Sequence, residues 1–332
     1  MKYNLNSTKD VTSSDLLVLP VFGEDKELKF TSAWDKSLKE FFNGLTLAKN
    51  FKASAGETVF FNSIEGQNFV ALGLGSKKGF SIENLRREMA KLATGSKMKT
   101  KSLTLSLESL KIKGLDSTIN AIVEGMELAT YAFDEHLSKK AECTLEVVNL
   151  DTKEKAASVK KLQKVIDETL LVTQSIAIAR DFVNSPPNVL NSETYAKAVK
   201  KDVSKINGVS VKINGKKELK KMGAGLFLSV NAGSAFEPQM VHLTYTPKKV
   251  TKKTKHIALV GKGLTFDTGG YSLKPGGSMV NMKFDMAGSS TLYGAFRAAA
   301  LLELPVKVTC VLGMTDNAVN EHATMPDSIV TG

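Results

Sequence analysis

Short apolar segments alternate with amphipathic ones along the first half of the chain. Five of the apolar segments, 16–22, 58–62, 69–74, 103–107 and 144–150, are rich in β-branched or large residues and are bounded by Gly, Ser or charged residues. This pattern predicts strands. Apolar residues recur at helical spacing in 81–93 and 116–137, which predicts two helices. Strands that alternate with helices indicate a layered α/β fold.

A long helical pattern without Gly or Pro follows over 153–183. It ends at Asn184-Ser185-Pro186-Pro187, because a proline lacks a donor and pushes the residue before it out of the helical region. We interpret this segment as a connecting helix. The predicted organisation is an N-terminal α/β domain over 1–150, a linking helix over 151–183 and a second domain over 184–332.

The second domain also combines helix and strand patterns. Helices are predicted over 192–203, 216–222 and 286–302, and strands over 209–213, 226–231, 240–245, 257–260 and 306–312. The strands at 257–260 and 306–312 are separated by a glycine-rich loop and a helix. Such a crossover joins parallel strands, and ligands in open α/β sheets bind beyond their carboxyl ends.

The composition is that of an ordinary globular protein: 332 residues, 42% hydrophobic and 24% charged. It excludes disordered, collagen-like and coiled-coil classes. Cys143 and Cys310 lie far apart in apolar segments, which predicts buried thiols in a reducing compartment. No apolar stretch approaches the roughly 20 residues that span a bilayer. We expect a cytoplasmic protein with no membrane partner.

The formal net charge of +11 is concentrated in the second half. Residues 1–150 are nearly balanced, with 20 basic and 19 acidic residues, whereas 151–332 carry 25 basic and 15 acidic ones. The densest run lies in 248–255 and contains five lysines. A phosphate-binding patch is one interpretation, but a solvated hairpin loop is favoured because no aromatic residue or Arg is interleaved.

Candidate chemistry is concentrated in 256–316. Lys262, Asp267 and Lys274 are all expected in the glycine-rich loop, and Asp285 at the start of the following helix. Carboxylates suit Mg or Mn, and a lysine amine that has lost its proton can also ligate a dication. Glycines at 261, 263, 269 and 270 are expected to let the backbone approach a ligand and to adopt positive φ. The plainer alternative is two surface ion pairs beside a tight turn.

Other chemistries lack their motifs. The sequence has no complete phosphate-binding loop, no Gly-x-Ser-x-Gly elbow and no His-Glu-x-x-His. The histidines at 136, 242, 256 and 322 show no paired spacing, so each is expected to be structural rather than a zinc ligand.

The sequence closely resembles the leucyl aminopeptidase family, the cytosolic two-metal exopeptidases. The resemblance rests on Val260-Gly-Lys-Gly-Leu-Thr-Phe-Asp-Thr-Gly-Gly-Tyr-Ser-Leu-Lys-Pro275, Met282-Lys-Phe-Asp-Met-Ala-Gly288, Ala179-Arg-Asp-Phe-Val-Asn-Ser-Pro-Pro-Asn188 and the Gly-Ser at 233–234. It is dense from about 176 to 332 and architectural before that. It implies a macro-like N-terminal domain and an incomplete, mixed-sheet α/β aminopeptidase domain.

The resemblance also implies the roles of individual residues. Lys262, Asp267 and Asp285 are expected to ligate two divalent ions (Zn, Mn or Mg), with Asp267 shared between them. Lys274 is expected to polarise the scissile carbonyl, and Met282 to line an apolar pocket for the N-terminal side chain. Peptides with leucine-like N-terminal residues are the expected substrates. The family gives Asp316, a carboxylate after the last predicted strand, no metal role.

Departures from the family pattern include Thr268, Tyr271, Ala287 and Ser289-Ser290. The chain stops before the family's Asn-Thr-Asp-Ala-Glu-Gly-Arg-Leu segment, which supplies two more carboxylates and an arginine that holds bicarbonate. We therefore expect a truncated and nearly inactive chain, and the resemblance implies a hexamer for the complete protein. The alternatives are a nucleic-acid-binding role, motivated by the basic second half, and a non-catalytic assembly piece.

Overall fold

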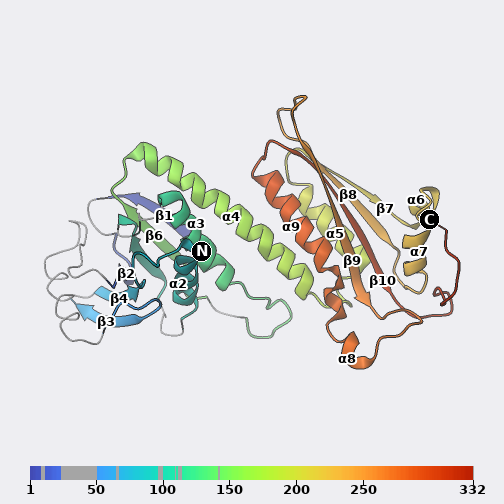
Figure 1. The fold of residues 1–332 in the computed structure, drawn as a ribbon, viewed down its shortest axis with the longest axis horizontal. Helices are drawn as coiled ribbons and strands as arrows, with labels where there is room; N and C mark the ends of the chain where they lie inside the picture. The colour runs from blue at the N-terminus through green and yellow to red at the C-terminus, as the bar shows by residue number, and fades with distance from the viewer. Residues whose placement is uncertain are drawn as a thin grey trace. The chain divides into compact units, whose positions relative to one another are not determined.

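The computed structural model describes residues 1–8, 12–23, 51–64, 67–95, 100–108, 110, 114–140 and 143–331 (Figure 1). The chain forms two compact units, Met1–Thr173 and Gln174–Gly332. Each unit has its own cluster of buried apolar side chains. The predicted two-domain α/β fold is confirmed. The domain bounds proposed at 150 and 183 stay a prediction.

The first unit is built on a six-stranded sheet in the order β1-β6-β5-β2-β4-β3. All neighbouring strands are parallel except β3, which pairs antiparallel with β4. Its strands are β1 (Lys2–Ser7), β2 (Leu16–Val21), β3 (Thr58–Ile64), β4 (Gln67–Gly73), β5 (Ser102–Ser106) and β6 (Val147–Thr152). Five of them correspond to the predicted strands.

The hydrophobic pattern does not predict β1, because polar residues interrupt it. Asn4 Nδ2 donates to Asn149 Oδ1 at 2.9 Å, and Asn6 Nδ2 donates to Asp151 Oδ1 at 3.0 Å. Both acceptors lie on β6, the parallel neighbour of β1. Side-chain hydrogen bonds therefore take the place of apolar contacts on one face of this edge strand.

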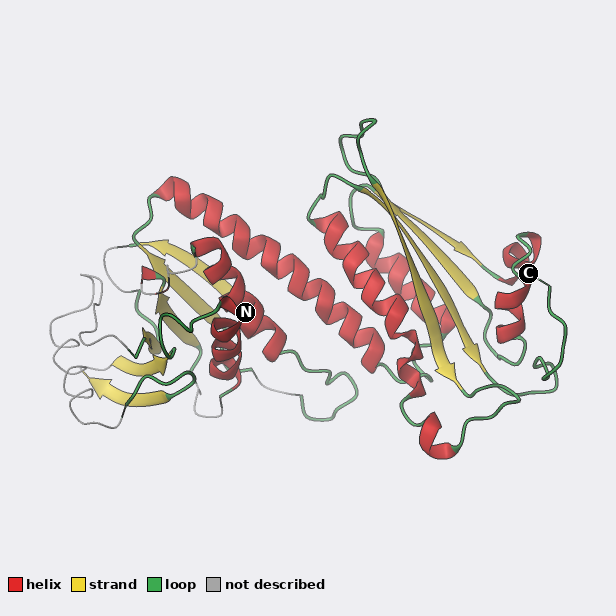
Figure 2. Ribbon diagram, viewed as in Figure 1, coloured by secondary structure: helices red, strands yellow, loops and turns green. Residues whose placement is uncertain are grey.

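Two helices, α2 (Ile82–Thr94) and α3 (Leu115–Ala129), pack against the sheet and against each other (Figure 2). Gly125 permits their close approach, because a Cβ there would lie 2.3 Å from the backbone oxygen of Arg86. The helix predicted over 116–137 is too long. It ends at Ala129, where the Thr130 hydroxyl donates to the Met126 carbonyl at 2.9 Å.

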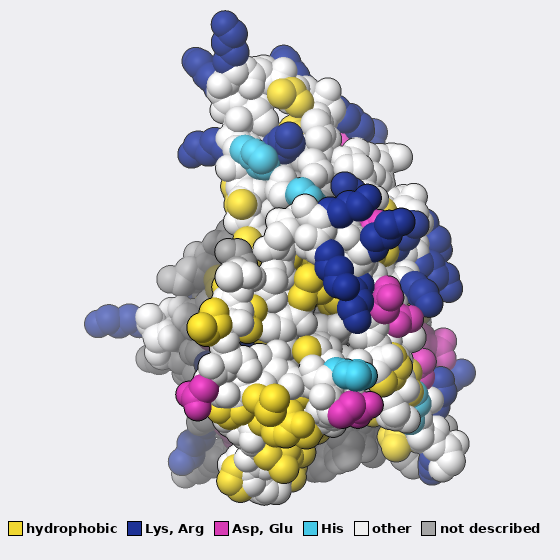
Figure 3. All heavy atoms as spheres, turned by 90° about the vertical axis from the view of Figure 1, so that its right-hand side faces the viewer, with side chains coloured by type: hydrophobic (Ala, Val, Ile, Leu, Met, Phe, Trp, Pro, Cys, Tyr) yellow, Lys and Arg dark blue, Asp and Glu magenta, His cyan; other side chains and the backbone are white. Residues whose placement is uncertain are grey.

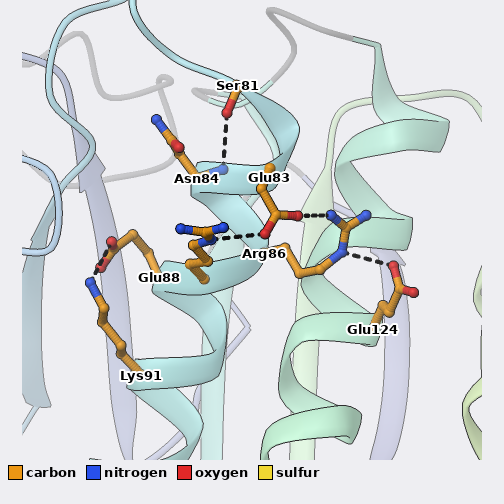
Figure 4. A network of polar contacts seen from close by, with 8 residues as sticks. Ser81, Glu83, Asn84, Arg86, Glu88, Lys91 and Glu124 are labelled. Atoms are coloured by element: carbon orange, nitrogen blue, oxygen red, sulfur yellow. Dashed lines mark hydrogen bonds and ion pairs between the residues drawn. The ribbon is translucent and has the colours of Figure 1, made fainter.

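Polar contacts fix the start of α2 (Figure 4). The Ser81 hydroxyl accepts a hydrogen bond from the Asn84 amide at 3.1 Å, which caps the helix. Arg86 lies between two carboxylates: it pairs with Glu83 on its own helix, and its Nε donates to Glu124 of α3 at 2.8 Å. The arginine thus links the two helices.

The chain continues into α4 (Ala156–Asn184), which corresponds to the predicted connecting helix and ends before Pro186. The division between the two units falls within α4, after Thr173. Among the residues that the structure describes, no helix has the length and apolar character needed to cross a membrane.

The second unit contains a mixed four-stranded sheet in the order β7-β8-β10-β9. The strands are β7 (Val209–Asn214), β8 (Gln239–Tyr245), β9 (His256–Asp267) and β10 (Lys307–Asn317). The helices are α5 (Ser192–Val203), α6 (Lys216–Lys221), α7 (Gly225–Asn231), α8 (Gly276–Met279), the 3₁₀ helix η2 (Met282–Met286) and α9 (Ala287–Leu301).

The predicted parallel crossover is confirmed, because β9 and β10 pair in parallel and α9 lies between them in sequence. Residues from α5 and α9, among them Tyr195 and Phe296, are buried with Leu243 and Cys310 of the sheet. These two helices cover one face of the sheet (Figure 2).

Two predictions for this unit are wrong. The segment predicted as a strand over 226–231 is α7, whose Phe227 packs on Gly313 of β10. A short apolar run does not distinguish a strand from a buried helical turn. The lysine-rich segment is not a hairpin, since β8 and β9 lie on opposite sides of β10. Its lysines are nevertheless exposed, and Lys248 pairs with Glu303 at 2.6 Å.

Candidate metal centre and active site

The candidate residues lie at the carboxyl end of β9, in the loop after it and in η2. The glycines around them have two separate uses. Gly269 and Gly270 have φ of +89° and +65°, as predicted for the turn after β9. Gly261 and Gly263 have no positive φ: a Cβ would lie 2.5 Å from the Ser289 Cα at Gly261 and 2.6 Å from the Gly313 oxygen at Gly263. These two glycines make room for the neighbouring backbone, so the prediction that they adopt positive φ is wrong.

Asp267 is the last residue of β9 and the most heavily hydrogen-bonded of the candidates. Its Oδ1 accepts from the Gly269 amide at 3.0 Å and from Asn317 Nδ2 at 2.9 Å. Its Oδ2 accepts from Lys274 Nζ at 2.7 Å. Burial alone raises the pKa of Asp267, but these three donors outweigh burial and hold the pKa below its usual value. The carboxylate is therefore kept ionised.

Lys274 connects β9 to η2. Besides its ion pair with Asp267, its Nζ lies 2.9 Å from the Sδ of Met282, the first residue of η2. The Lys274 amide donates to the Thr268 carbonyl at 2.9 Å, which closes the loop between β9 and Lys274. Met282 is half-buried. The two residues expected at the substrate thus lie together.

Lys262 and Asp285 form the second ion pair, with Lys262 Nζ 3.0 Å from Asp285 Oδ1. Asp285 lies in η2, immediately before α9, as predicted. Its Oδ2 is buried and accepts no hydrogen bond from the described part of the chain. A buried carboxylate oxygen without a partner is costly, and a cation is one group that would satisfy it.

The structure therefore brings the predicted residues together as two ion pairs, Lys262–Asp285 and Lys274–Asp267. The plainer interpretation from the sequence also expects these pairs. Exposure differs between the lysine side chains: Lys262 is 58% exposed and Lys274 27%. Among the described residues, no three His, Cys, Asp or Glu side chains form a metal-binding group, so a centre here needs the lysine amine or further ligands.

Two neighbouring residues of β10 have different contacts. Asp316 does not join the ion pairs: its carboxylate accepts from the Ser234 hydroxyl, and burial raises its pKa. Asn317, which the sequence did not single out, donates to Asp267. The one available signal was its place at the carboxyl end of the strand beside β9.

A hollow of about 280 Å³ adjoins this site. It lies between the end of α7, the turn after β9 and the segment that follows β10, and its lining includes Val230, Gly270, Tyr271, Asn317 and Met325. Toward the lower end of the face in Figure 3, hydrophobic side chains gather. Asn317, which lines the hollow, also donates a hydrogen bond to Asp267.

The two cysteines belong to different units, Cys143 to the first and Cys310 to the second. Cys310 is buried within β10, and burial raises its thiol pKa to about 12. Cys143 is exposed in the segment before β6, so the prediction that both thiols are buried is wrong for this one. The sequence around Cys143 resembles a strand, but β6 begins only at Val147.

Comparison with known sequences gives a match along most of the chain. The profile of the cytosol aminopeptidase family's catalytic domain matches residues 177–332, and that of its N-terminal domain matches 18–140. Among curated relatives, the "probable cytosol aminopeptidase" of Clostridium perfringens is 34% identical over 96% of this chain and 64% of its own length. That of Haemophilus influenzae strain PittGG is 31% identical over 100% of this chain and 68% of its own. The chain thus spans about two thirds of these relatives' length.

Solved structures give a corresponding match. The bottromycin maturation enzyme BotP, in complex with Mn, superposes with a TM-score of 0.76 at 25% identity, covering 96% of this chain and 63% of BotP. A mutant tomato leucine aminopeptidase superposes with a TM-score of 0.80 at 21% identity, covering 99% and 65%. The tomato structure shows a shared fold.

Proposed function

The chain belongs to the cytosol aminopeptidase family, and on that premise we propose that it removes N-terminal residues from peptides at a two-metal centre. Lys262, Asp267 and Asp285 are the proposed metal ligands, Lys274 the catalytic lysine, and Met282 part of the pocket for the substrate side chain. The proposal includes a cytoplasmic location, since the curated relatives are named for the cytosol.

The observation that carries this proposal is the orphaned, buried Oδ2 of Asp285. The other oxygen of Asp285, Oδ1, pairs with Lys262 of β9, and a second carboxylate, Asp267, ends that strand. Two carboxylates, together with a Lys262 amine that has lost its proton, form a donor set that fits divalent cations.

Each side chain has a distinct part in this scheme. Bound dications supply Lewis acidity toward the scissile carbonyl and a nucleophilic water. The two carboxylates and the Lys262 amine hold them. The Lys274 ammonium, already beside Asp267 and Met282, is placed to stabilise charge that develops on the carbonyl oxygen. Zn, Mn and Mg all remain candidates, and BotP is solved with Mn. Bicarbonate and a hexameric assembly remain expectations from the resemblance.

The decisive experiment measures Mn²⁺ binding to the unsubstituted chain and to Asp267→Ala, by the loss of the free-ion electron paramagnetic resonance signal. We expect Asp267→Ala to lower metal occupancy, because each lost ligand leaves an ion under-coordinated. Asn320→Ala is the control, since that side chain accepts from the His322 amide at 2.8 Å and belongs to neither ion pair. Unchanged stoichiometry in Asp267→Ala would refute the assignment.

Turnover is measured with leucine p-nitroanilide in the presence of Mn²⁺ or Zn²⁺. Three proposed side-chain ligands are few for two dications, which each take about six donors. We therefore expect the 332-residue chain to bind metal weakly and to turn over slowly. A rate within about tenfold of the ordinary median of roughly 10 s⁻¹ would contradict this expectation.

Specificity follows from Met282. An apolar wall favours N-terminal Leu or Met over Asp or Glu, because an acidic side chain would lose water there without gaining a partner. Competition by dipeptides for metal-loaded protein measures this preference. Preferential binding of acidic N-termini would exclude the proposed pocket.

Nucleic acid binding is the second candidate function. The observation that favours it is that α5 and α6 each carry several exposed lysines: Lys197, Lys200 and Lys201 on α5, and Lys216, Lys217, Lys220 and Lys221 on α6. Lys and Arg side chains gather on one side and at the top of the face drawn in Figure 3. Clustered cations attract polyanions regardless of sequence.

A further inference from the structure

Asn317 ends β10 directly opposite Asp267, the last residue of β9. The pairing passes from Thr315 and Leu264 to Asn317 and Asp267, so β9 takes three steps where β10 takes two. The extra residue is a bulge in β9. Bulges turn the side chains that follow them and are common beside functional sites. Here the bulge brings the carboxylate of Asp267 to the Asn317 amide.

The Asn317 side chain and the Gly269 amide together engage one oxygen of Asp267. Asn317 Nδ2 lies 2.9 Å and Gly269 N 3.0 Å from Oδ1. Only Oδ2 remains, and it faces the amine of Lys274 at 2.7 Å. The rotation of the carboxylate is thereby fixed, and one defined oxygen points toward Lys274.

Asn317 also holds the turn after β9, but through its backbone. Its carbonyl accepts from the Thr268 amide at 3.0 Å and from the Thr268 hydroxyl at 2.8 Å. A change of the Asn317 side chain leaves these two bonds available. Its effect on the carboxylate can therefore be separated from its effect on the turn.

We propose that Asn317 is a positioning residue of the metal centre, whose amide orients Asp267 so that Oδ2 is presented to a bound cation. The proposal rests on the function proposed above. An amide suits this task because it donates a hydrogen bond without adding to the positive charge of Lys274, whose Nζ already lies 2.7 Å from Oδ2. Hydrogen bonds to ligating carboxylates affect metal affinity by about 10- to 100-fold.

The test is Mn²⁺ binding to two variants. Asn317→Leu keeps about the same side-chain volume but removes the amide donor. Asn317→Ala also removes the donor, and its smaller side chain cannot clash with the backbone at Gly270. We expect both variants to bind Mn²⁺ about 10- to 100-fold more weakly than the unsubstituted chain. We also expect the paramagnetic resonance spectrum of the bound ion to change, because its ligand geometry changes. Asn320→Ala, in the segment after β10, is expected to match the unsubstituted chain.

The outcomes separate this inference from the function on which it rests. Unchanged affinity in a folded Asn317→Ala overturns the inference and leaves the metal centre standing. So does a loss of affinity that only parallels a lower melting temperature, with an unchanged spectrum of the bound ion. If the unsubstituted chain binds no Mn²⁺, or Asp267→Ala binds it equally well, the proposed function itself fails.

Discussion

Lys274 is the residue at which metal binding and catalysis can be told apart. Its Nζ pairs with Asp267 Oδ2, but in the proposed centre it is not a ligand. Lys274→Ala should therefore retain Mn²⁺, because the three proposed ligands remain, and should hydrolyse leucine p-nitroanilide ~100-fold more slowly than the unsubstituted chain. Metal binding and turnover are measured on the same preparation. A variant that lost metal but kept its rate per bound ion would reverse this assignment.

The two cysteines should differ sharply in reactivity. Cys143 is exposed, whereas Cys310 is buried with a pKa raised to about 12. Only a thiolate attacks Ellman's reagent readily, so one thiol per chain should react in the native protein and two in denaturant. Cys143→Ser should remove the fast phase. If both thiols reacted rapidly in the native protein, the buried Cys310 would have to become exposed through local unfolding of β10.

The close packing of β9 against the start of α9 depends on Gly261, which has no side chain. A Cβ at Gly261 would lie 2.5 Å from the Ser289 Cα and 3.1 Å from the Ser289 amide nitrogen, and backbone atoms cannot rotate away. Gly261→Ala should therefore destabilise the second unit by about 1–3 kcal/mol, measured by urea unfolding. Gly277→Ala is the matched control, since a Cβ there has no neighbour within 4 Å. Equal stability of the two variants would contradict the packing.

Elements with a clear period were predictable, and elements defined by their neighbours were not. The capping box of α5, in which Asn191 and Thr194 exchange hydrogen bonds, marks its start locally. By contrast, α7 becomes helical where Phe227 packs on β10, and β1 depends on partners on β6 about 145 residues away. Such long-range contacts leave little trace in a local pattern.

The same distinction holds in the candidate site. Lys262, Asp267, Lys274 and Asp285 share one crossover unit, so chain order alone brings them near one another. Asn317 lies 50 residues from Asp267 and meets it through the register of β9 and β10. A single asparagine at the end of a strand carries no motif, and the bulge that turns Asp267 toward it depends on the paired strands.

At the scale of the whole molecule, the excess charge of the second half predicts a salt-sensitive affinity for polyanions. We expect weak, sequence-independent binding to duplex DNA at low salt, lost by a factor of about 10³ or more between 50 and 200 mM salt if six or more lysines bind phosphates. Fluorescence anisotropy with labelled DNA measures it.

Neutralising four lysines of α6, at 216, 217, 220 and 221, should make the affinity for DNA less dependent on salt. The slope of log affinity against log salt concentration falls by roughly one for each lysine–phosphate contact that is lost. Neutralising Lys160, Lys161 and Lys164 of α4 is the control outside this group. Binding that does not weaken with salt would exclude the polyanion interpretation, and an equal effect of both variants would place the DNA-binding surface elsewhere.

The hollow beside the site has a pharmacological consequence. A small molecule seated there would touch Asn317 and Gly270, and Asn317 donates to a proposed metal ligand. It would need neither a metal-chelating group nor any likeness to a peptide. Compounds selected for this hollow would avoid the chelating warheads that cause inhibitors to cross-react among metalloenzymes.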